Sequence, residues 1–247
     1  MNSQQNWYKT FFNGLALEVW TKVMTPDYTN TEVQFIKEFI RNANGNILDI
    51  PCGNGRHSIA LAKEGYTVTS IDIAEEYISS LREVIDKENL PIIPIQADIL
   101  EYELSGEFDL AICLGNSFSY FNYYQTLEFA KKVYGVLKTG GAFLVNTGAV
   151  AESILPSVQL KDWIEVDGIL FLSERLYHAE SSVLQSNYRI IQKEKIEYKT
   201  AYHHVFTLAE IRRLLTEAGF GEIEQYSGFD KTPYKYGDRQ AFIVATK

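Results

Sequence analysis

The sequence Ile-Leu-Asp-Ile-Pro-Cys-Gly-Asn-Gly-Arg-His-Ser at residues 47–58 joins an apolar run to a glycine-rich turn. The apolar run predicts a buried strand, and the residues after the turn predict a helix. Glycine at positions 53 and 55 allows a ligand to approach the backbone, and the free N–H groups at the start of a helix favour an anionic group. This segment therefore predicts a cofactor site.

Apolar strands and helices alternate between residues 46 and 147. Strands that are apolar throughout and separated by helices are typical of a parallel sheet covered on both faces. We therefore expect an α/β fold that binds its ligands beyond the carboxyl ends of the strands. Helical spacing of apolar residues also predicts helices at 7–24 and 31–43. The expected strands are 46–50, 67–71, 92–96, 108–113 and 141–147, with helices at 57–64, 75–87 and 124–137.

The pattern changes between residues 158 and 205. Segments of alternating polarity, separated by short turn-like sequences, predict an antiparallel insertion there. Beyond it, Thr207 and Glu210 have the spacing of a capping box, and Gly219 ends the helix that they begin. The α/β pattern then resumes with two last strands at 222–227 and 239–246.

Composition narrows the class of protein. The chain has 247 residues, of which 46% are hydrophobic, and this suffices for one α/β domain with an insertion. The net charge of −9 and the isoelectric point near 5.0 argue against sequence-independent binding to nucleic acid, which needs clustered Lys and Arg. We expect an enzyme of small metabolites.

Targeting and metal-binding signals are not evident. The N-terminal residues lack the basic start and apolar run of a signal peptide, and no apolar stretch approaches the roughly 20 residues of a membrane span. Cys52 and Cys113 have no Cys or His partner at metal-ligand spacing, so we expect neither a metal nor a disulfide. The expected location is the cytoplasm, and no membrane contact is expected.

Three carboxylates at strand ends distinguish between cofactors. Asp49 ends the first strand, where it would pair with an ammonium group; S-adenosylmethionine carries one and a dinucleotide pyrophosphate does not. Asp72 ends the second strand, where it can accept hydrogen bonds from ribose hydroxyls. Asp98 follows the third strand and would accept a hydrogen bond from an adenine amino group. Ile73 and Ile99 would enclose the adenine ring.

Taken in order, these residues resemble class I S-adenosylmethionine-dependent methyltransferases, and the sequence at 49–58 is similar to the small-molecule branch of that family. The resemblance covers residues 30–150 and, in outline, 205–247. It implies a Rossmann-like sheet with strand order 3-2-1-4-5-7-6 and an antiparallel last strand. It also implies the cofactor-binding residues Tyr8, Asp49, Pro51, Cys52, Gly53, Gly55, Arg56, Asp72, Ile73, Asp98, Ile99, Leu114 and Gly115.

Two other functions stay open at this point. An NAD(P)-dependent oxidoreductase uses the same strand, turn and helix, although Asp49 and Ser58, which stands where a third glycine is usual, count against it. A protein that binds S-adenosylmethionine without turnover is the other alternative, because no motif identifies an acceptor.

The acceptor must lie above the carboxyl ends of the fourth and fifth strands. Three segments can cover this place: N-terminal lid helices within residues 1–44, the insertion at 152–205, and the loop at 226–239. We expect all of them to belong to a single domain over residues 1–247. Clustered aromatic residues suggest an aromatic-lined pocket. The expected pocket residues are Trp7, Asn116, Tyr120, Arg189, Tyr234 and Arg239.

A general base is expected within Tyr202-His203-His204, because histidine titrates near neutrality. Successive strand residues point to opposite faces, so at most one of the two histidines faces the pocket. The sequence Leu-Gly-Asn-Ser at 114–117 differs from the Asn/Asp-Pro-Pro-Tyr/Phe motif associated with methylation of nucleic-acid bases. We therefore expect methyl transfer to nitrogen or oxygen of a small molecule, by a monomer or homodimer.

Overall fold

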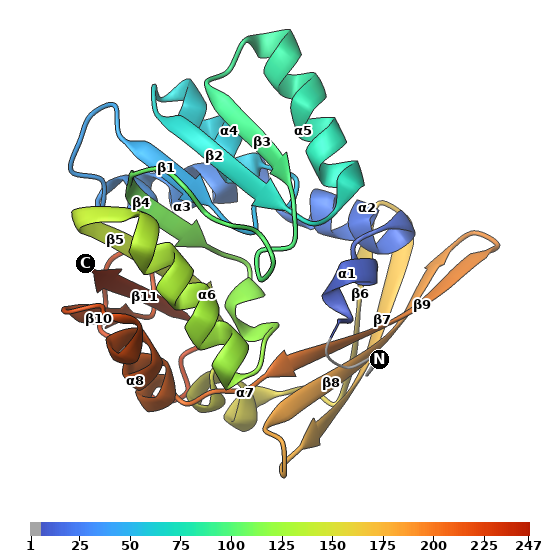
Figure 1. The fold of residues 1–247 in the computed structure, drawn as a ribbon. Helices are drawn as coiled ribbons and strands as arrows, with labels where there is room; N and C mark the ends of the chain where they lie inside the picture. Colours follow the sequence, from blue (N-terminus) through green and yellow to red (C-terminus); the bar gives the residue numbers. More distant parts are fainter. Residues whose placement is uncertain (1–5) are drawn as a thin grey trace.

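The computed structural model describes residues 6–247, and its centre is a seven-stranded sheet (Figure 1). The strand order is β10-β11-β5-β4-β1-β2-β3. Numbered within this sheet alone, this is the order 3-2-1-4-5-7-6, which confirms the predicted fold class. The strands are β1 (Asn46–Asp49), β2 (Thr67–Asp72), β3 (Ile92–Gln96), β4 (Phe108–Cys113), β5 (Leu137–Thr147), β10 (Ile223–Tyr226) and β11 (Ala241–Thr246).

Most of the sheet is parallel. β1 pairs in parallel with both β2 and β4, while β11 runs antiparallel to β5 and β10, as predicted for the last strand. In this register Asp49 lies beside Ser70 of β2 and Ile112 of β4. The carboxyl ends of these strands therefore meet at one edge, where the strand order switches direction between β1 and β4.

The sheet separates two hydrophobic cores, because successive strand residues point to opposite faces. On β1, Ile47 belongs to one core and Leu48 to the other, and both are fully buried. This double burial explains why the strands are apolar throughout. One face is covered by α3 (Pro26–Lys37), α4 (Arg56–Lys63) and α5 (Glu75–Glu88), and the other by α6 (Tyr123–Val136) and α8 (Leu208–Ala218).

The N-terminal segment differs from the two helices predicted at 7–24 and 31–43. It forms three helices, α1 (Tyr8–Phe11), α2 (Gly14–Val23) and α3. The Thr25 side chain accepts a hydrogen bond from the Tyr28 N–H, and Pro26 occupies the first turn, so α3 begins earlier than expected. Residues 1–5 of the predicted lid lie outside the described residues.

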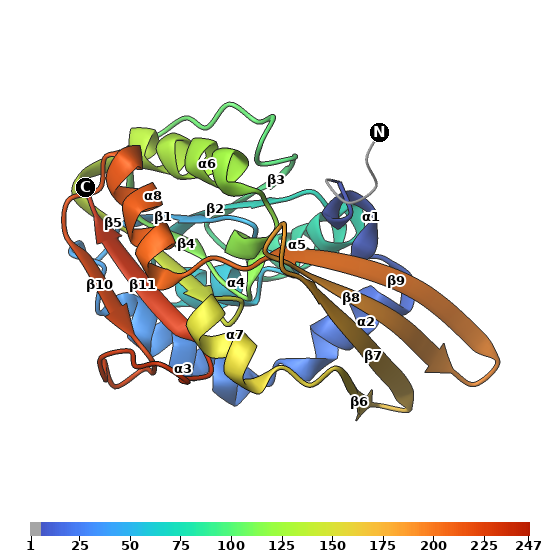
Figure 2. The same ribbon diagram turned by 90° about the horizontal axis from the view of Figure 1, so that it is seen from below.

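The predicted antiparallel insertion is confirmed as a second sheet. Its order is β6-β7-β8-β9, and α1 and α2 pack against it (Figures 1 and 2). A helix that the sequence did not predict, α7 (Ala151–Ser157), connects β5 to this sheet. Among residues 6–247, no helix is both long and apolar enough to cross a membrane. The strands of the second sheet are β6 (Lys161–Val166), β7 (Ile169–His178), β8 (Val183–Gln192) and β9 (Lys195–His204).

The predicted capping box at the start of α8 is confirmed. The Thr207 Oγ1 accepts a hydrogen bond from the Glu210 N–H at 3.1 Å, and the Thr207 N–H donates to the Glu210 carboxylate at 2.8 Å. Two N–H groups that the helix itself leaves unpaired are satisfied in this way.

We expect Thr207→Ala to lower the free energy of unfolding by about 1 kcal/mol, because the first turn of α8 loses its cap. Urea denaturation followed by circular dichroism measures the change. Thr216→Ala, at an exposed position of the same helix, is the control and should change stability by less than about 0.5 kcal/mol. Equal stability of the two variants would contradict the importance of the cap.

Candidate active site

A cavity of about 440 Å³ lies at the edge where the carboxyl ends of the parallel strands meet. Three parts of the chain line it: the loops after β1 to β5, helices α1 and α2, and one face of the second sheet. The volume is in the range of ligand sites that enclose a small molecule. The cavity therefore brings the glycine turn together with the insertion.

The two glycines of the turn are required for different reasons. Gly53 has a φ of +55°, and a Cβ there would meet nothing within 4 Å, so its open side faces the cavity that it lines. Gly55 has a φ of +73°, but a Cβ there would lie 2.7 Å from Leu81 of α5. Glycine at 53 thus permits close approach of a ligand, whereas glycine at 55 permits the packing of α4 on α5. Gly55 does not line the cavity, and its predicted contact with the ligand stays a prediction.

Asp72 joins the glycine turn to the end of β2. Its two carboxylate oxygens accept hydrogen bonds from the N–H groups of Gly53 and Ala74, both at 2.8 Å, and the side chain lines the cavity. Burial raises the pKa of Asp72 to about 6, although these two N–H groups oppose the shift. The carboxylate is therefore held beside the turn with lone pairs left for a further donor.

Asp49 lies next to the turn but does not line the cavity. Its carboxylate accepts a hydrogen bond from the Ser58 hydroxyl at 2.6 Å, and Ser58 in turn accepts one from Ser70 at 2.7 Å. Burial raises the pKa of Asp49 above its ordinary value. In this structure the residue connects β1, β2 and α4, and its predicted contact with an ammonium group stays a prediction.

Asp98 attaches the N-terminal helices to the loop after β3. It accepts a hydrogen bond from the Tyr8 hydroxyl at 3.1 Å and forms an ion pair with Lys9 at 2.7 Å. Tyr8, Asp98 and Ile99 all line the cavity, and their predicted contacts with the cofactor stay predictions. Burial, followed by the charge of Asp98, raises the pKa of the Tyr8 hydroxyl, which therefore stays protonated and donates.

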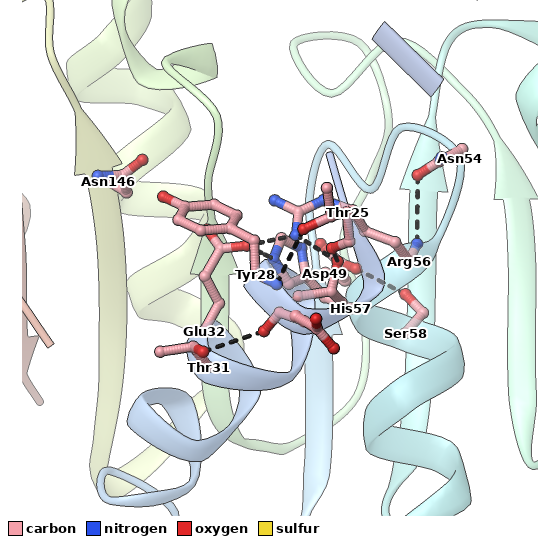
Figure 3. Close-up of polar contacts among 12 residues, drawn as sticks. Thr25, Tyr28, Thr31, Glu32, Asp49, Asn54, Arg56, His57, Ser58 and Asn146 are labelled. Carbon is pink, nitrogen blue, oxygen red and sulfur yellow. Dashed lines mark hydrogen bonds and ion pairs between the residues drawn. The ribbon is translucent and has the colours of Figure 1, made fainter. Parts of the chain in front are cut away.

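A buried ionic cluster that the sequence did not predict supports the start of α4 (Figure 3). Glu32 of α3 forms an ion pair with Arg56 and a hydrogen bond, 3.0 Å long, with the His57 ring. Burial alone would raise the pKa of Glu32, but the hydrogen bonds and charges of His57 and Arg56 outweigh burial, so the pKa is lowered. Glu32 thus fixes the side of Arg56 that faces away from the cavity.

The loop after β4 and the N-terminal helix supply the aromatic wall. Leu114, Gly115 and Asn116, which were predicted to contact the cofactor or the acceptor, line the cavity. The predicted pocket residues Trp7 and Tyr120 also line it, with ring centroids 4.8 Å apart. These contacts close the cavity on the side of α1.

The structure separates the three residues of the predicted general base. His203 lines the cavity, and its ring lies 5.3 Å from Trp7 and 5.6 Å from Tyr120. His204 and Tyr202 do not line it, and His204 instead stacks on Phe206. Burial, with the positive charges of His204 and Arg175 adding to it, lowers the pKa of His203 to about 4. His203 is therefore a neutral imidazole at physiological pH.

Three predicted pocket residues lie outside the cavity: Arg189, Tyr234 and Arg239. Arg189 is exposed on the opposite face of β8. Tyr234 contacts α7 instead, where its hydroxyl lies 2.7 Å from the Ser153 hydroxyl. Because α7 contributes Ile154 to the cavity, this unpredicted helix occupies the place expected for the loop at 226–239.

The sequence also missed residues of the second sheet that line the cavity. Burial alternates along β8: Leu184, Ser186 and Tyr188 are buried. Asn187, which precedes Tyr188, and Arg189, which follows it, are exposed. This alternation was the signal that could have placed Arg189 outside. The lining residues from this sheet are Arg175, Leu184, Ser186, Tyr188, Ala201 and His203, and α2 adds Trp20.

Comparison with known proteins agrees with this arrangement. A family model described as a methyltransferase domain matches residues 47–141. A putative methyltransferase of Geobacillus sp. is 23% identical, with 98% of this chain and 97% of that protein covered. The glycine/sarcosine N-methyltransferase of Halorhodospira halochloris is 28% identical over 86% of this chain and 79% of its own length.

A solved structure has the same fold. It is that of CalS10, an amino pentose methyltransferase from Micromonospora echinaspora, with S-adenosylmethionine bound. The TM-score is 0.71 at 15% identity, and 95% of this chain and 98% of that chain are covered.

Residues 47–141 match a methyltransferase domain, and the methyltransferase relatives together with the shared fold support a class I S-adenosylmethionine-dependent methyltransferase. S-adenosylmethionine is its cofactor. The oxidoreductase alternative is not favoured, because the matched domain and relatives are methyltransferases.

We expect Glu32→Gln to lower the free energy of unfolding by about 3 kcal/mol at pH 7, because Arg56 loses its buried counter-charge and His57 loses its charged hydrogen-bond partner. Since the pKa of Glu32 is lowered on folding, its stabilisation is present above about pH 4.5 and is lost as the pH falls through the folded-state value. The difference between wild type and variant should therefore shrink below pH 4.5.

Denaturation by urea across a pH series measures this difference. Glu38→Gln is the control. Glu38 pairs with Lys231 at the exposed surface, so this substitution should lower the free energy of unfolding by less than about 1 kcal/mol. A pH-independent difference between wild type and Glu32→Gln would argue against an ionic role for Glu32.

Proposed function

We propose that this enzyme transfers the methyl group to nitrogen or oxygen of a small molecule, with nitrogen as the favoured acceptor atom. The observation that carries the proposal is the single cavity of about 440 Å³ that joins the glycine turn to the inner face of the second sheet. A volume of this order suits a cofactor together with a small acceptor.

The residues around the turn fit S-adenosylmethionine. The open side of Gly53 leaves room for the methionine part, beside Arg56, whose guanidinium would face the methionine carboxylate. Asp72 would accept hydrogen bonds from the ribose hydroxyls. The remaining cofactor-binding residues of this proposal enclose the adenine ring and the sulfonium: Tyr8, Pro51, Cys52, Ile73, Asp98, Ile99, Leu114 and Gly115.

The proposed cover of the site consists of α1, α2 and the second sheet, which we assign to the same domain as the main sheet. Trp7 of the N-terminal segment contacts both Tyr120 and His203, so it connects the loop after β4 to β9. Tyr8 and Lys9 attach the same segment to Asp98. These contacts would exclude water from the reacting atoms.

When bound, S-adenosylmethionine supplies an electrophilic methyl group on a sulfonium. The protein's contribution is alignment, because the acceptor lone pair must approach the methyl carbon opposite the breaking C–S bond. The C–S electron pair stays on sulfur, and the acceptor nitrogen afterwards loses its proton to solvent. Tyr120 and His203 line the cavity where the acceptor would lie.

The low pKa of His203, about 4, decides its role. An imidazole with this pKa is a weak base and does not hold a proton at neutral pH, but one ring nitrogen accepts a hydrogen bond. We therefore assign His203 to positioning a neutral acceptor amine rather than to proton abstraction. The names of the relatives support nitrogen, since they include a glycine/sarcosine N-methyltransferase.

We expect S-adenosylhomocysteine to bind the wild-type protein and NAD not to bind, as measured by isothermal titration calorimetry. Asp72→Asn should weaken S-adenosylhomocysteine by about 100-fold, because hydrogen bonds to a charged carboxylate are lost. Asp86→Asn, which removes an exposed carboxylate from α5, should leave the affinity unchanged. Binding of NAD alone would overturn the proposed function.

The same titration has a pH dependence that tests Asp72. Ribose hydroxyls donate to the charged carboxylate, and the pKa of Asp72 in the unbound protein is about 6. The affinity of the wild type should therefore fall by up to tenfold per pH unit below pH 6, and that of Asp72→Asn should not. Parallel pH profiles would remove Asp72 from the ribose site.

We expect His203→Ala to lower kcat/KM by about tenfold through the loss of one hydrogen bond, and His204→Ala to leave it unchanged. Because the pKa of His203 is about 4, the wild-type rate should show no break from this residue between pH 6 and 8. A labelled-methyl assay with an acceptor found by screening pooled metabolites gives these rates. A break near pH 6.5 that His203→Ala abolishes would restore the general-base role.

A further inference from the structure

The end of the cavity at the second sheet contains hydrogen-bond donors but no acidic side chain. Arg175 on β7, Ser186 on β8 and Ala201 on β9 lie side by side in the register of the sheet, and all three line the cavity. Ser186 is 1% exposed and Ala201 is equally buried. Their small side chains leave the space beside the Arg175 guanidinium open.

Arg175 is only weakly neutralised by the protein. Its hydrogen bond to the Gln159 carbonyl, at 2.9 Å, and its ion pair with Asp162, at 3.0 Å, both use Nη1. The Asp162 side chain is 41% exposed, so water screens this ion pair. Within residues 6–247, Nε and Nη2 of Arg175 have no hydrogen-bond acceptor. Two adjacent N–H groups of a planar guanidinium are the geometry that binds a carboxylate bidentately.

Two tryptophans provide an independent observation. The indole N–H groups of Trp7 and Trp20 are buried and have no hydrogen-bond partner among the described residues, and both side chains line the same cavity. A buried donor without a partner costs about 1–3 kcal/mol, so such groups mark places where a ligand supplies the acceptor.

The two indoles pack against different strands of the second sheet. Trp20 packs on Phe171 of β7, at 5.8 Å between ring centroids, and Phe171 packs on Tyr188. Trp7 packs on His203 at 5.3 Å. The ligand that satisfies the donors between them must therefore be rich in acceptor oxygens.

We propose that the methyl acceptor is a small amine that carries a carboxylate, which Arg175 binds through Nε and Nη2 with a further hydrogen bond from the Trp20 indole. The inference rests on the proposed function and specifies its substrate class. A single guanidinium balances the one charge of a carboxylate, whereas a phosphate monoester carries nearly two.

The spacing suits an acceptor with its amine and carboxylate a few atoms apart. Arg175 and His203 lie on strands that are separated by β8, and His203 is two residues further along the register, so their backbones are roughly 12 Å apart. The Arg175 contacts with Gln159 and Asp162 lie on the β6 side of β7, so the guanidinium is at the far side of the sheet from His203. The amine would then lie near His203 and Tyr120, and the carboxylate near Arg175.

The first test compares acceptors. Glycine, sarcosine, β-alanine and 4-aminobutyrate are each paired with the amine that lacks the carboxylate: methylamine, dimethylamine, ethylamine and propylamine. Labelled methyl transfer is expected only for members that carry a carboxylate. Aminomethylphosphonate tests the phosphate-like anion, and a preference for it over glycine would overturn the choice of carboxylate.

The second test uses variants. Arg175→Gln should raise KM for a carboxylate acceptor by at least 100-fold, and Arg175→Lys should raise it by less. Trp20→Phe keeps an aromatic ring but removes the N–H, and it should raise the same KM by about tenfold. The Kd of S-adenosylhomocysteine should stay at the wild-type value in all three, which also shows that they are folded. Arg189→Gln is the control for KM. It also removes one positive charge, but from the outer face of the second sheet, so KM should stay at the wild-type value.

A binding measurement makes the result independent of turnover. With S-adenosylhomocysteine bound, the NMR line of carbon-13 acetate should broaden with wild type and with Arg189→Gln, but not with Arg175→Gln. Equal broadening by all three proteins, or none with wild type, would overturn the carboxylate site. If S-adenosylhomocysteine itself fails to bind the wild type, the proposed function fails first. If it binds but the preferred acceptor lacks a carboxylate, only this inference falls.

Discussion

The active site depends on two hydrogen bonds made by one carboxylate. Asp72 holds the N–H groups of Gly53 and Ala74, so the turn after β1 and the end of β2 move as one unit. Water is largely excluded from this place, and burial raises the pKa of the carboxyl to about 6. The charge is kept because two backbone donors already point at it, and a ribose would add further donors to the same oxygens. Positioning of the turn and the proposed recognition of the cofactor would therefore use one residue.

The other side of the turn is held by charge rather than by backbone. Glu32 lies on α3, outside the segment that the methyltransferase model matches, yet it neutralises Arg56 and binds His57 at the start of α4. Arg56 makes its ion pair with Glu32 through Nη1, which leaves its other nitrogens for the cavity. Arg175 provides a second positive group at the far end of the same cavity. The two arginines would thus separate the carboxylate of the cofactor from that of the acceptor.

Much of the fold was predictable because its signals are local. Strands such as Phe108–Cys113 are apolar at every position, since residues on both of their faces are buried, and Thr207 with Glu210 marks a helix start over four residues. The errors lie where no local signal exists. The helix Ala151–Ser157 contains Pro156 and only one buried residue, so its sequence has no helical apolar face. It nevertheless occupies the place where Tyr234 was expected.

The sequence by itself determined the parallel sheet, the glycine turn and the three strand-end carboxylates, because burial on both faces and a left-handed turn each demand particular residues within a few positions. Only the tertiary structure decided which of these residues meet the cavity. Asp49 turns to Ser58, and Gly55 is required by Leu81. Arg175 and Trp20 line one cavity although more than 150 positions separate them in the chain. Which distant residues line one cavity depends on how the two sheets and a helix pack together. Packing between segments far apart in the sequence leaves no pattern in a single sequence.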